Sequence, residues 1–204
     1  MNAPSVVLTL VTDRRQVMEG RDLVTLAGEA ARAGVDLIQL REKDLEGRAL
    51  LDLAASIVRA VAGTRARVLV SGRPDVALAA GADGVQLPEN GLAVPDVKRA
   101  FPGLVVGASR HSVDGARRAE SEGADFVVLG PVFPTPGKEA RALGLAVLGA
   151  AARAVAIPVY AIGGIAPANA RQVVEAGARG LAAIRAYLEA PADVAADAFR
   201  QALS

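Results

Sequence analysis

The sequence predicts a (βα)8 barrel formed by a single domain over residues 1–204, and a recurring phrase is the main reason. "RAGVDLIQL" (32–40) and "AAGADGVQL" (79–87) share a pattern with residues 121–129 and 175–183: a helix end, a glycine, a charged residue and an apolar run. Glycine suits the left-handed position that ends a helix. A short, unbroken apolar run suits a parallel strand covered on both faces. Each phrase therefore predicts a helix-to-strand junction.

Eight strands follow from these junctions and from further apolar runs, at 6–11, 37–40, 67–70, 84–87, 105–108, 126–129, 159–162 and 180–184. Helical periodicity separates the strands, as in 50–62 and in 111–123, where Ser112 suits the N-cap position. Eight βα units in a chain of 204 residues predict a compact barrel. A doubly wound open sheet is the alternative, but it usually has fewer strands and a glycine-rich fingerprint in its first turn, which this chain lacks.

Composition excludes several classes of function. A net charge of +1 and an aromatic content of 3% give no reason to expect nucleic acid or a membrane surface as a partner. The chain has no cysteine, and His111 is its single histidine, so thiolate and multi-histidine metal sites are excluded. Because the amino terminus lacks a leader-like segment and no apolar run could span a bilayer, we expect a cytoplasmic protein. Self-association is left open.

Ligands in this fold bind at the carboxyl ends of the strands, so the residues that follow each strand form the candidate site. These residues are rich in Arg and Lys although the whole chain is nearly neutral, which indicates an anionic small molecule. Gly163 and Gly164 follow the seventh strand. Their bare backbone, with a helix opening at Pro167, favours phosphate binding, and a tight turn is the alternative explanation.

A candidate anion clamp follows the second strand. Gln39, Arg41 and Lys43 alternate along one side of this segment, and a solvated charged loop is the alternative. The long, proline-rich loop after the sixth strand adds Thr135 and Lys138 as polar contacts.

Three residues are candidate acids or bases. Glu42 and Glu89 follow strands two and four, and His111 begins a helix after strand five. An exposed salt bridge is the alternative for each glutamate, and a helix-start or packing role is the alternative for the histidine. Asp83 and Asp125 belong to the helix–strand junctions at the opposite end of the barrel, where we expect them to be structural.

Seven stretches of the chain, in this order, resemble the thiamine phosphate synthase/TenI family of (βα)8 proteins. They are "LVTDR" (10–14), "IQLREKD" (38–44), "GRPDVAL" (72–78), "GADGVQLPE" (81–89), "GASRHS" (107–112), "LGPVFPTPGK" (129–138) and "AIGGIAPAN" (161–169). Synthases of this family join a hydroxymethylpyrimidine diphosphate to a thiazole phosphate, with Mg²⁺ on the departing pyrophosphate. The TenI branch includes a tautomerase that aromatises a carboxythiazole phosphate without a required metal.

The resemblance also implies two binding regions. Gln39, Arg41 and Lys43, helped by Ser109 and Lys138, would bind the pyrophosphate. The glycine pair after strand seven and the loop after strand eight would bind the thiazole phosphate.

This chain departs from the synthase pattern at several positions. Synthases have Asn-Asp where it has Ser71 and Gly72, and Gly91 stands at the second metal-binding Asp position after strand four. Because Mg²⁺ needs oxygen ligands, no metal site is expected. "VQLPE" is the TenI-like version, yet the tautomerase His after strand six is replaced by Pro131. Arg185 stands in place of a synthase Ser and would add positive charge beside the phosphate.

The leading interpretation is a TenI-like protein of thiamine biosynthesis that binds a thiazole phosphate and acts as a metal-independent thiazole tautomerase, without a cofactor. Proton transfer would then fall to Glu42, Glu89 or His111. The first alternative is a thiamine phosphate synthase, with Mg²⁺ held by groups such as Asp13 or Glu89. The second alternative is a non-catalytic protein that binds a phosphorylated ligand.

Overall fold

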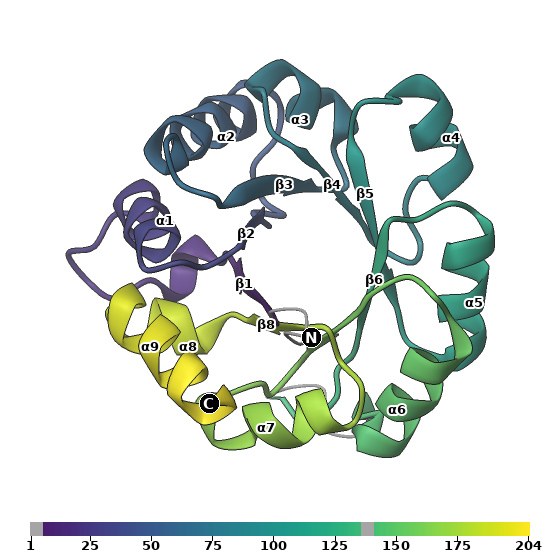
Figure 1. Ribbon diagram of the computed structural model, residues 1–204. Coiled ribbons are helices and arrows are strands. Elements are labelled where there is room, and N and C mark those ends of the chain that lie inside the picture. Colours follow the sequence, from purple (N-terminus) through teal and green to yellow (C-terminus); the bar gives the residue numbers. More distant parts are fainter. Residues whose placement is uncertain (1–5, 136–140) are drawn as a thin grey trace.

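The computed structural model describes residues 6–135 and 141–204, and these form a closed barrel of parallel strands inside a ring of helices (Figure 1). Each strand pairs with the next along the chain, and the last pairs with the first. The strands are β1 (Val7–Val11), β2 (Leu37–Leu40), β3 (Arg67–Ser71), β4 (Gly84–Leu87), β5 (Val105–Arg110), β6 (Phe126–Leu129), β7 (Val159–Ile162) and β8 (Gly180–Ala183). The predicted (βα)8 barrel is confirmed.

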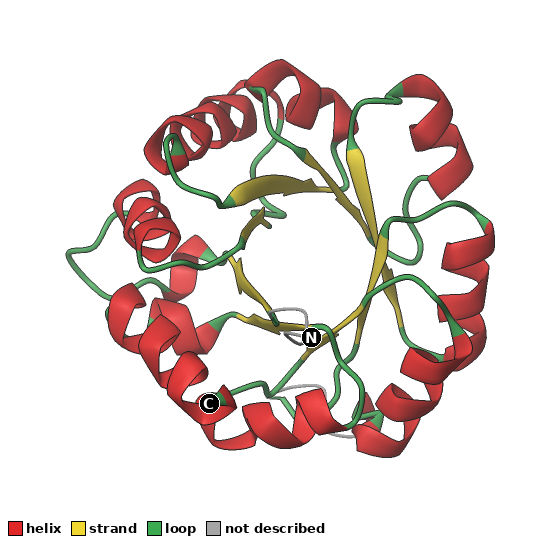
Figure 2. Ribbon diagram, viewed as in Figure 1, coloured by secondary structure: helices red, strands yellow, loops and turns green. Residues whose placement is uncertain are grey.

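Helices follow the strands and enclose them, as the colours of Figure 2 show. They are η1, a 3₁₀ turn (Arg14–Gln16), α1 (Leu23–Arg32), α2 (Gly47–Val61), α3 (Pro74–Ala80), α4 (Val94–Ala100), α5 (Val113–Ser121), α6 (Gly144–Ala154), α7 (Pro167–Glu175), α8 (Arg185–Leu188) and α9 (Ala192–Leu203). Ser112 caps α5 as predicted, because its hydroxyl accepts the Gly115 N–H at 3.0 Å. Among the described residues, none of the helices combines the length and apolar character needed to cross a membrane.

The recurring phrase has a physical explanation at each of its four positions. Gly34, Gly81, Gly123 and Gly177 all have positive φ angles, between 71° and 110°, and each lies where a helix ends. Residues with a Cβ atom rarely adopt this conformation, so glycine lets the chain turn directly from helix into strand.

The charged residue of the phrase ties neighbouring strands together. In three of the four phrases it is an aspartate whose carboxylate accepts a backbone N–H of the adjacent strand: Asp36 from Leu8 at 2.9 Å, Asp83 from Val68 at 2.8 Å, and Asp125 from Val106 at 2.6 Å. These contacts lie at the amino ends of the strands, away from the predicted site. The structural roles expected for Asp83 and Asp125 are confirmed.

Two separate apolar layers fill the molecule. The larger lies between the strands and the helices, and the smaller lies inside the barrel and is formed by Leu37, Leu69, Phe126, Val128 and Tyr160. Phe126 and Tyr160 stack with their ring centres 4.7 Å apart. Glycines on adjacent strands make room for these rings: a Cβ on Gly107 would lie 2.3 Å from Phe126, and one on Gly180 would lie 2.5 Å from Tyr160. Two aromatic rings therefore close the lower part of the barrel.

Candidate active site at the barrel mouth

Two glutamine–serine pairs lie inside the upper barrel. Gln39 and Ser71 each follow an inward-facing leucine by two residues, so strand alternation turns them inward as well. The Gln39 amide donates to the Ser71 hydroxyl oxygen at 2.9 Å, and the Gln86 amide donates to the Ser109 hydroxyl oxygen at the same distance. No described group accepts a hydrogen bond from either serine hydroxyl. Both O–H groups can therefore donate to a ligand.

Gln86 also supplies a buried acceptor. Its side-chain oxygen is buried and has no hydrogen-bond partner among the described residues. Buried polar atoms usually have a partner, so this oxygen marks a place where a donor would be stabilised. Neither Ser71 nor Gln86 is among the contact residues predicted from the sequence. Counting two residues on from the inward-facing Leu69 and from Gly84 would have found them.

Glu42 is held in a hydrogen-bond network that joins the loops after β1 and β2. Its side chain is only 2% exposed, and it accepts the Thr12 hydroxyl at 2.6 Å and the Arg14 backbone N–H at 3.1 Å. The Arg14 guanidinium contacts Glu42 at 3.2 Å and both oxygens of Asp44 at 2.6 Å. These hydrogen bonds from Arg14 hold the pKa of the Asp44 carboxyl well below its usual range. This geometry gives Glu42 a positioning role, and its predicted part in proton transfer stays untested.

The two cations of the predicted anion clamp lie in different surroundings. Arg41 is half-buried, and continuing the β2–β3 register by one residue places it beside Ser71. Its backbone N–H donates to Thr12 at 2.9 Å, and its guanidinium makes no ion pair with a described residue. Lys43 is exposed. Of the two, Arg41 is thus the better placed to meet an anion in the mouth.

Two of the three predicted acid–base residues are brought together. Glu89, after β4, and His111, after β5, approach with 3.8 Å between Oε2 and Nε2. His111 Nδ1 is hydrogen-bonded to the Gly130 carbonyl oxygen. A carbonyl can only accept, so Nδ1 carries a proton and Nε2 is the nitrogen that faces Glu89. Both side chains are partly exposed, at 37% and 57%, so a ligand in the mouth could reach them.

The two positions aligned with metal-binding aspartates border the ring of Pro88. A Cβ built on Gly72 would have Pro88 Cδ as its nearest neighbour, at 3.8 Å, and one built on Gly91 would lie 2.9 Å from Pro88 Cγ. Within residues 6–135 and 141–204, no group of three or more His, Cys, Asp or Glu side chains is arranged to hold a metal ion. The described residues therefore do not fit a protein-held Mg²⁺ at this place.

The glycine pair after β7 is required by packing. Gly163 and Gly164 have φ angles of +95° and +67°, and a Cβ on either would lie within 2.7 Å of Pro131 or Phe133. The Phe133 N–H donates to the Gly163 carbonyl at 3.0 Å, so the loop after β6 packs on this turn. The tight-turn explanation is thus supported by the structure, while phosphate contact at these glycines stays a prediction.

The remaining predicted contacts are spread around the rim. Thr135 is half-buried, and Lys138 lies outside the described residues. Arg185 is exposed and is the first residue of the short helix α8, rather than part of an irregular loop.

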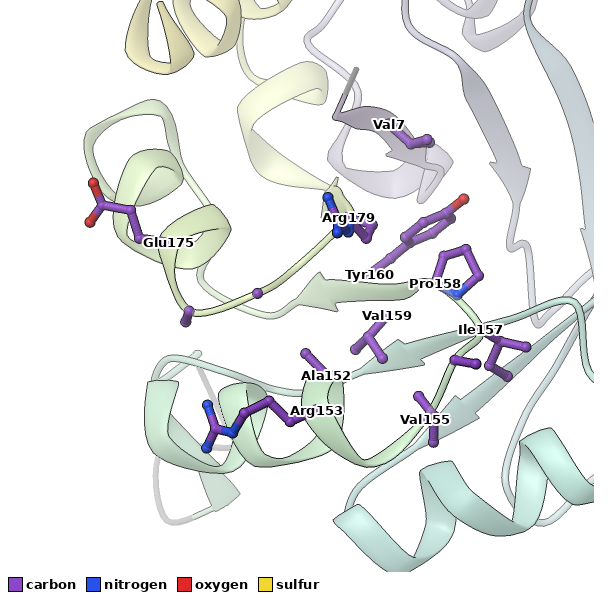
Figure 3. A pocket seen from close by; sticks show the side chains of 13 residues that line it. Val7, Ala152, Arg153, Val155, Ile157, Pro158, Val159, Tyr160, Glu175 and Arg179 are labelled. Carbon is purple, nitrogen blue, oxygen red and sulfur yellow. The ribbon is translucent and has the colours of Figure 1, made fainter. Parts of the chain in front are cut away.

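An open pocket of about 640 Å³ lies at the other end of the barrel (Figure 3). It is lined by Val7, Ala152, Arg153, Val155, Ala156, Ile157, Pro158, Val159, Tyr160, Glu175, Ala176, Gly177 and Arg179. These residues belong to the carboxyl ends of α6 and α7, to the loops that follow these two helices, and to the amino ends of β1 and β7. In this fold that face usually serves stability, and catalysis takes place at the mouth.

The fold and the polar mouth define a (βα)8-barrel protein whose candidate site lies at the carboxyl ends of its strands. The chain belongs to the thiamine monophosphate synthase family, which it matches over residues 8–187. The resemblance found in the sequence is thereby confirmed at the level of the family.

Named relatives agree with this assignment. The thiamine-phosphate synthase of Methanoculleus marisnigri is 46% identical over 184 residues, covering 89% of this chain and 87% of the relative. That of Pyrococcus furiosus is 40% identical, covering 90% and 87%. A solved structure of thiamine phosphate pyrophosphorylase from Pyrococcus furiosus superposes with a TM-score of 0.89 at 36% identity, covering 98% of this chain and 96% of the other. These names fit the synthase alternative better than the tautomerase interpretation.

Proposed function

We propose that this chain is a thiamine phosphate synthase, which joins a hydroxymethylpyrimidine diphosphate to a thiazole phosphate and releases pyrophosphate. Similarity to proteins named for this activity, at 36–46% identity over at least 89% of the chain, carries the proposal. The synthase thus replaces the tautomerase as the leading interpretation.

The mouth offers donors for the departing group. As the carbon–oxygen bond to the diphosphate breaks, the electron pair leaves with the pyrophosphate, and negative charge grows on its oxygens. The Arg41 guanidinium and the Ser71 hydroxyl lie on adjacent strand ends, and Gln39 fixes the serine oxygen. A donor held in place before the reaction, as Gln39 holds the Ser71 hydroxyl, stabilises such charge without reorganising, which lowers the barrier.

A proton-transfer reaction on a thiazole phosphate is the second candidate. The pairing of Glu89 with His111 favours it, because the Gly130 carbonyl holds the imidazole so that Nε2 is free to exchange a proton. No such pair is needed for the departure of pyrophosphate.

The two candidates are separated by assaying one preparation of the full chain for both reactions. We expect thiamine phosphate to form from the diphosphate and the thiazole phosphate. Arg41→Ala should lower kcat/KM by about tenfold or more, because it removes a charged hydrogen-bond donor. Arg48→Ala, on the exposed side of α2, is the matched control and should leave the rate unchanged. Conversion of the carboxythiazole phosphate tautomer without any thiamine phosphate would favour the second candidate. Inactivity in both assays would contradict both.

A further inference from the structure

At the corner between β3 and β4, both positions aligned with metal-binding aspartates are glycines, Gly72 and Gly91. Gly72 has a φ of +69°, and a Cβ added there would meet only Pro88 Cδ, at a comfortable 3.8 Å. The Cβ position of Gly91, in contrast, is already filled by the Pro88 ring, which a larger residue would have to displace. An apolar ring and bare backbone thus occupy the corner where oxygen ligands for Mg²⁺ would be needed.

Several described carboxylates elsewhere around the mouth already have hydrogen-bond or ion-pair partners. Asp13 accepts hydrogen bonds from Arg15 and Gln16, and Glu42 accepts them from Thr12 and Arg14. Asp44 accepts from Arg14, and Asp75 pairs with Arg73. Glu89 faces Nε2 of His111 at 3.8 Å. Asp13 and Glu89 are the substitute metal ligands that the synthase alternative requires. Recruiting Asp13 would break its hydrogen bonds with Arg15 and Gln16, which adds to the cost of binding a cation.

By contrast, the mouth has uncommitted donors. The guanidinium of Arg41 makes no ion pair with a described residue, and no described group accepts the Ser71 hydroxyl proton. A guanidinium beside a hydroxyl is a receptor for phosphate oxygens, and it needs no cation to bind them.

We propose that this chain has no Mg²⁺ site of its own, and that a divalent cation enters the mouth only as a complex with the diphosphate. The protein holds the diphosphate through Arg41 and Ser71, and the cation stays on the diphosphate oxygens that these donors leave free. The proposed function enters this proposal only through the identity of the diphosphate. That the protein itself holds no cation is inferred from the described residues alone.

The test uses Mn²⁺ in place of Mg²⁺ and inorganic pyrophosphate in place of the substrate. The Mn²⁺ that stays with the full chain after gel filtration is measured by electron paramagnetic resonance, first without and then with pyrophosphate. We expect the protein alone to retain no Mn²⁺, and the protein with pyrophosphate to retain it. One Mn²⁺ bound tightly per chain in the absence of pyrophosphate would overturn the proposal.

Two variants sharpen the result. Gly72→Asp adds one carboxylate where a Cβ meets no close neighbour, at a φ that Asp tolerates better than most residues, and should tighten Mn²⁺ retention with pyrophosphate about tenfold. Gly72→Asn, of the same shape, is its control and should show a smaller gain. If both variants behave as the wild type, the corner does not face the cation, and the proposal fails in its geometry.

The binding of the diphosphate by Arg41 is tested by isothermal titration calorimetry with pyrophosphate and no cation. Arg41→Gln should weaken binding about tenfold without any cation present, and Arg48→Gln should not. Equal affinity of Arg41→Gln and the wild type would refute it. Because binding is measured directly, a chain that fails to make thiamine phosphate would contradict the proposed function and leave this inference intact.

Discussion

Arg14 connects the first two loops of the mouth at the level of single side chains. It donates to Glu42 and Asp44, which lie 28 and 30 residues further along the chain, and Glu42 in turn accepts from Thr12. Glu42 is nearly fully buried, so removing any donor would leave a buried carboxylate short of partners. The network therefore sets the direction in which Arg41 leaves β2.

The Arg14–Asp44 pair predicts a pH-dependent stability. The pKa of Asp44 is lower in the folded protein than its ordinary value near 3.9, so the pair stabilises the fold above about pH 4. This contribution is lost progressively as the pH falls below that value toward the folded pKa. The difference in thermal midpoint between wild type and Asp44→Asn should therefore be larger at pH 7 than at pH 3.

A double-mutant cycle provides the control for this prediction. In an Arg14→Gln background, Asp44→Asn should give no such pH-dependent difference, because the partner is already absent. A difference between wild type and Asp44→Asn that stays constant from pH 7 to pH 3 would contradict the assignment.

At the scale of elements, the junction aspartates hold each strand to the next. The backbone N–H of Asp83 donates to the Val68 carbonyl oxygen, and the Asp83 carboxylate accepts the Val68 N–H. Asp83 therefore makes two hydrogen bonds with the same residue of β3. Asp36 and Asp125 repeat this arrangement with Leu8 and Val106. The amino ends of these strands thus gain hydrogen bonds that the ladder alone does not supply.

Removing one junction carboxylate should have a measurable cost. We expect Asp83→Ala to lower the free energy of unfolding in urea by about 1–2 kcal/mol, because the Val68 N–H loses a charged acceptor. Asp197→Ala, on the exposed side of α9, removes the same group without such a contact and should change it by less than about 0.5 kcal/mol. Equal effects of the two variants would show that the junction contact contributes nothing.

At the scale of the whole molecule, two stacked aromatic rings on β6 and β7 fill the lower interior of the barrel, and glycines on β5 and β8 leave room for them. Gly107 lies beside Phe126 and the Gln86 side chain, and Gly180 lies beside Tyr160. The low aromatic content of 3% does not indicate a weak core, because Phe126 and Tyr160 fill the interior of the barrel. Small residues on neighbouring strands complete the fit.

This packing predicts that a larger side chain destabilises the fold inside the barrel and has little effect on stability outside it. Gly107→Ala would place a Cβ 2.1 Å from the Gln86 amide oxygen and should reduce the free energy of unfolding by about 1–3 kcal/mol. Gly103→Ala makes the same replacement where nothing lies within 4 Å, and it should be neutral or slightly stabilising. Equal stability of the two variants would contradict the packing described for the interior.

Much of the architecture was predictable because it depends on local patterns. The phrase that contains Gly81 and Asp83 predicted a helix end followed by a strand, and the strand begins at Gly84 as expected. The predicted range 126–129 matches β6 at both ends. Local backbone preference and side-chain alternation act over a few residues, so they can be read directly from the chain.

The sequence by itself determined the barrel, the end of it that carries the candidate site, and the presence of cations among the residues there. The tertiary structure decided which of these side chains are engaged with one another and which are available to bind a ligand. It engages Glu42 with Arg14, pairs Glu89 with His111, and leaves the guanidinium of Arg41 without an ion pair to any described residue. It also packs Pro88 against Gly91. These partners come from different loops, and which side chains meet depends on strand register and barrel closure, which no local pattern specifies.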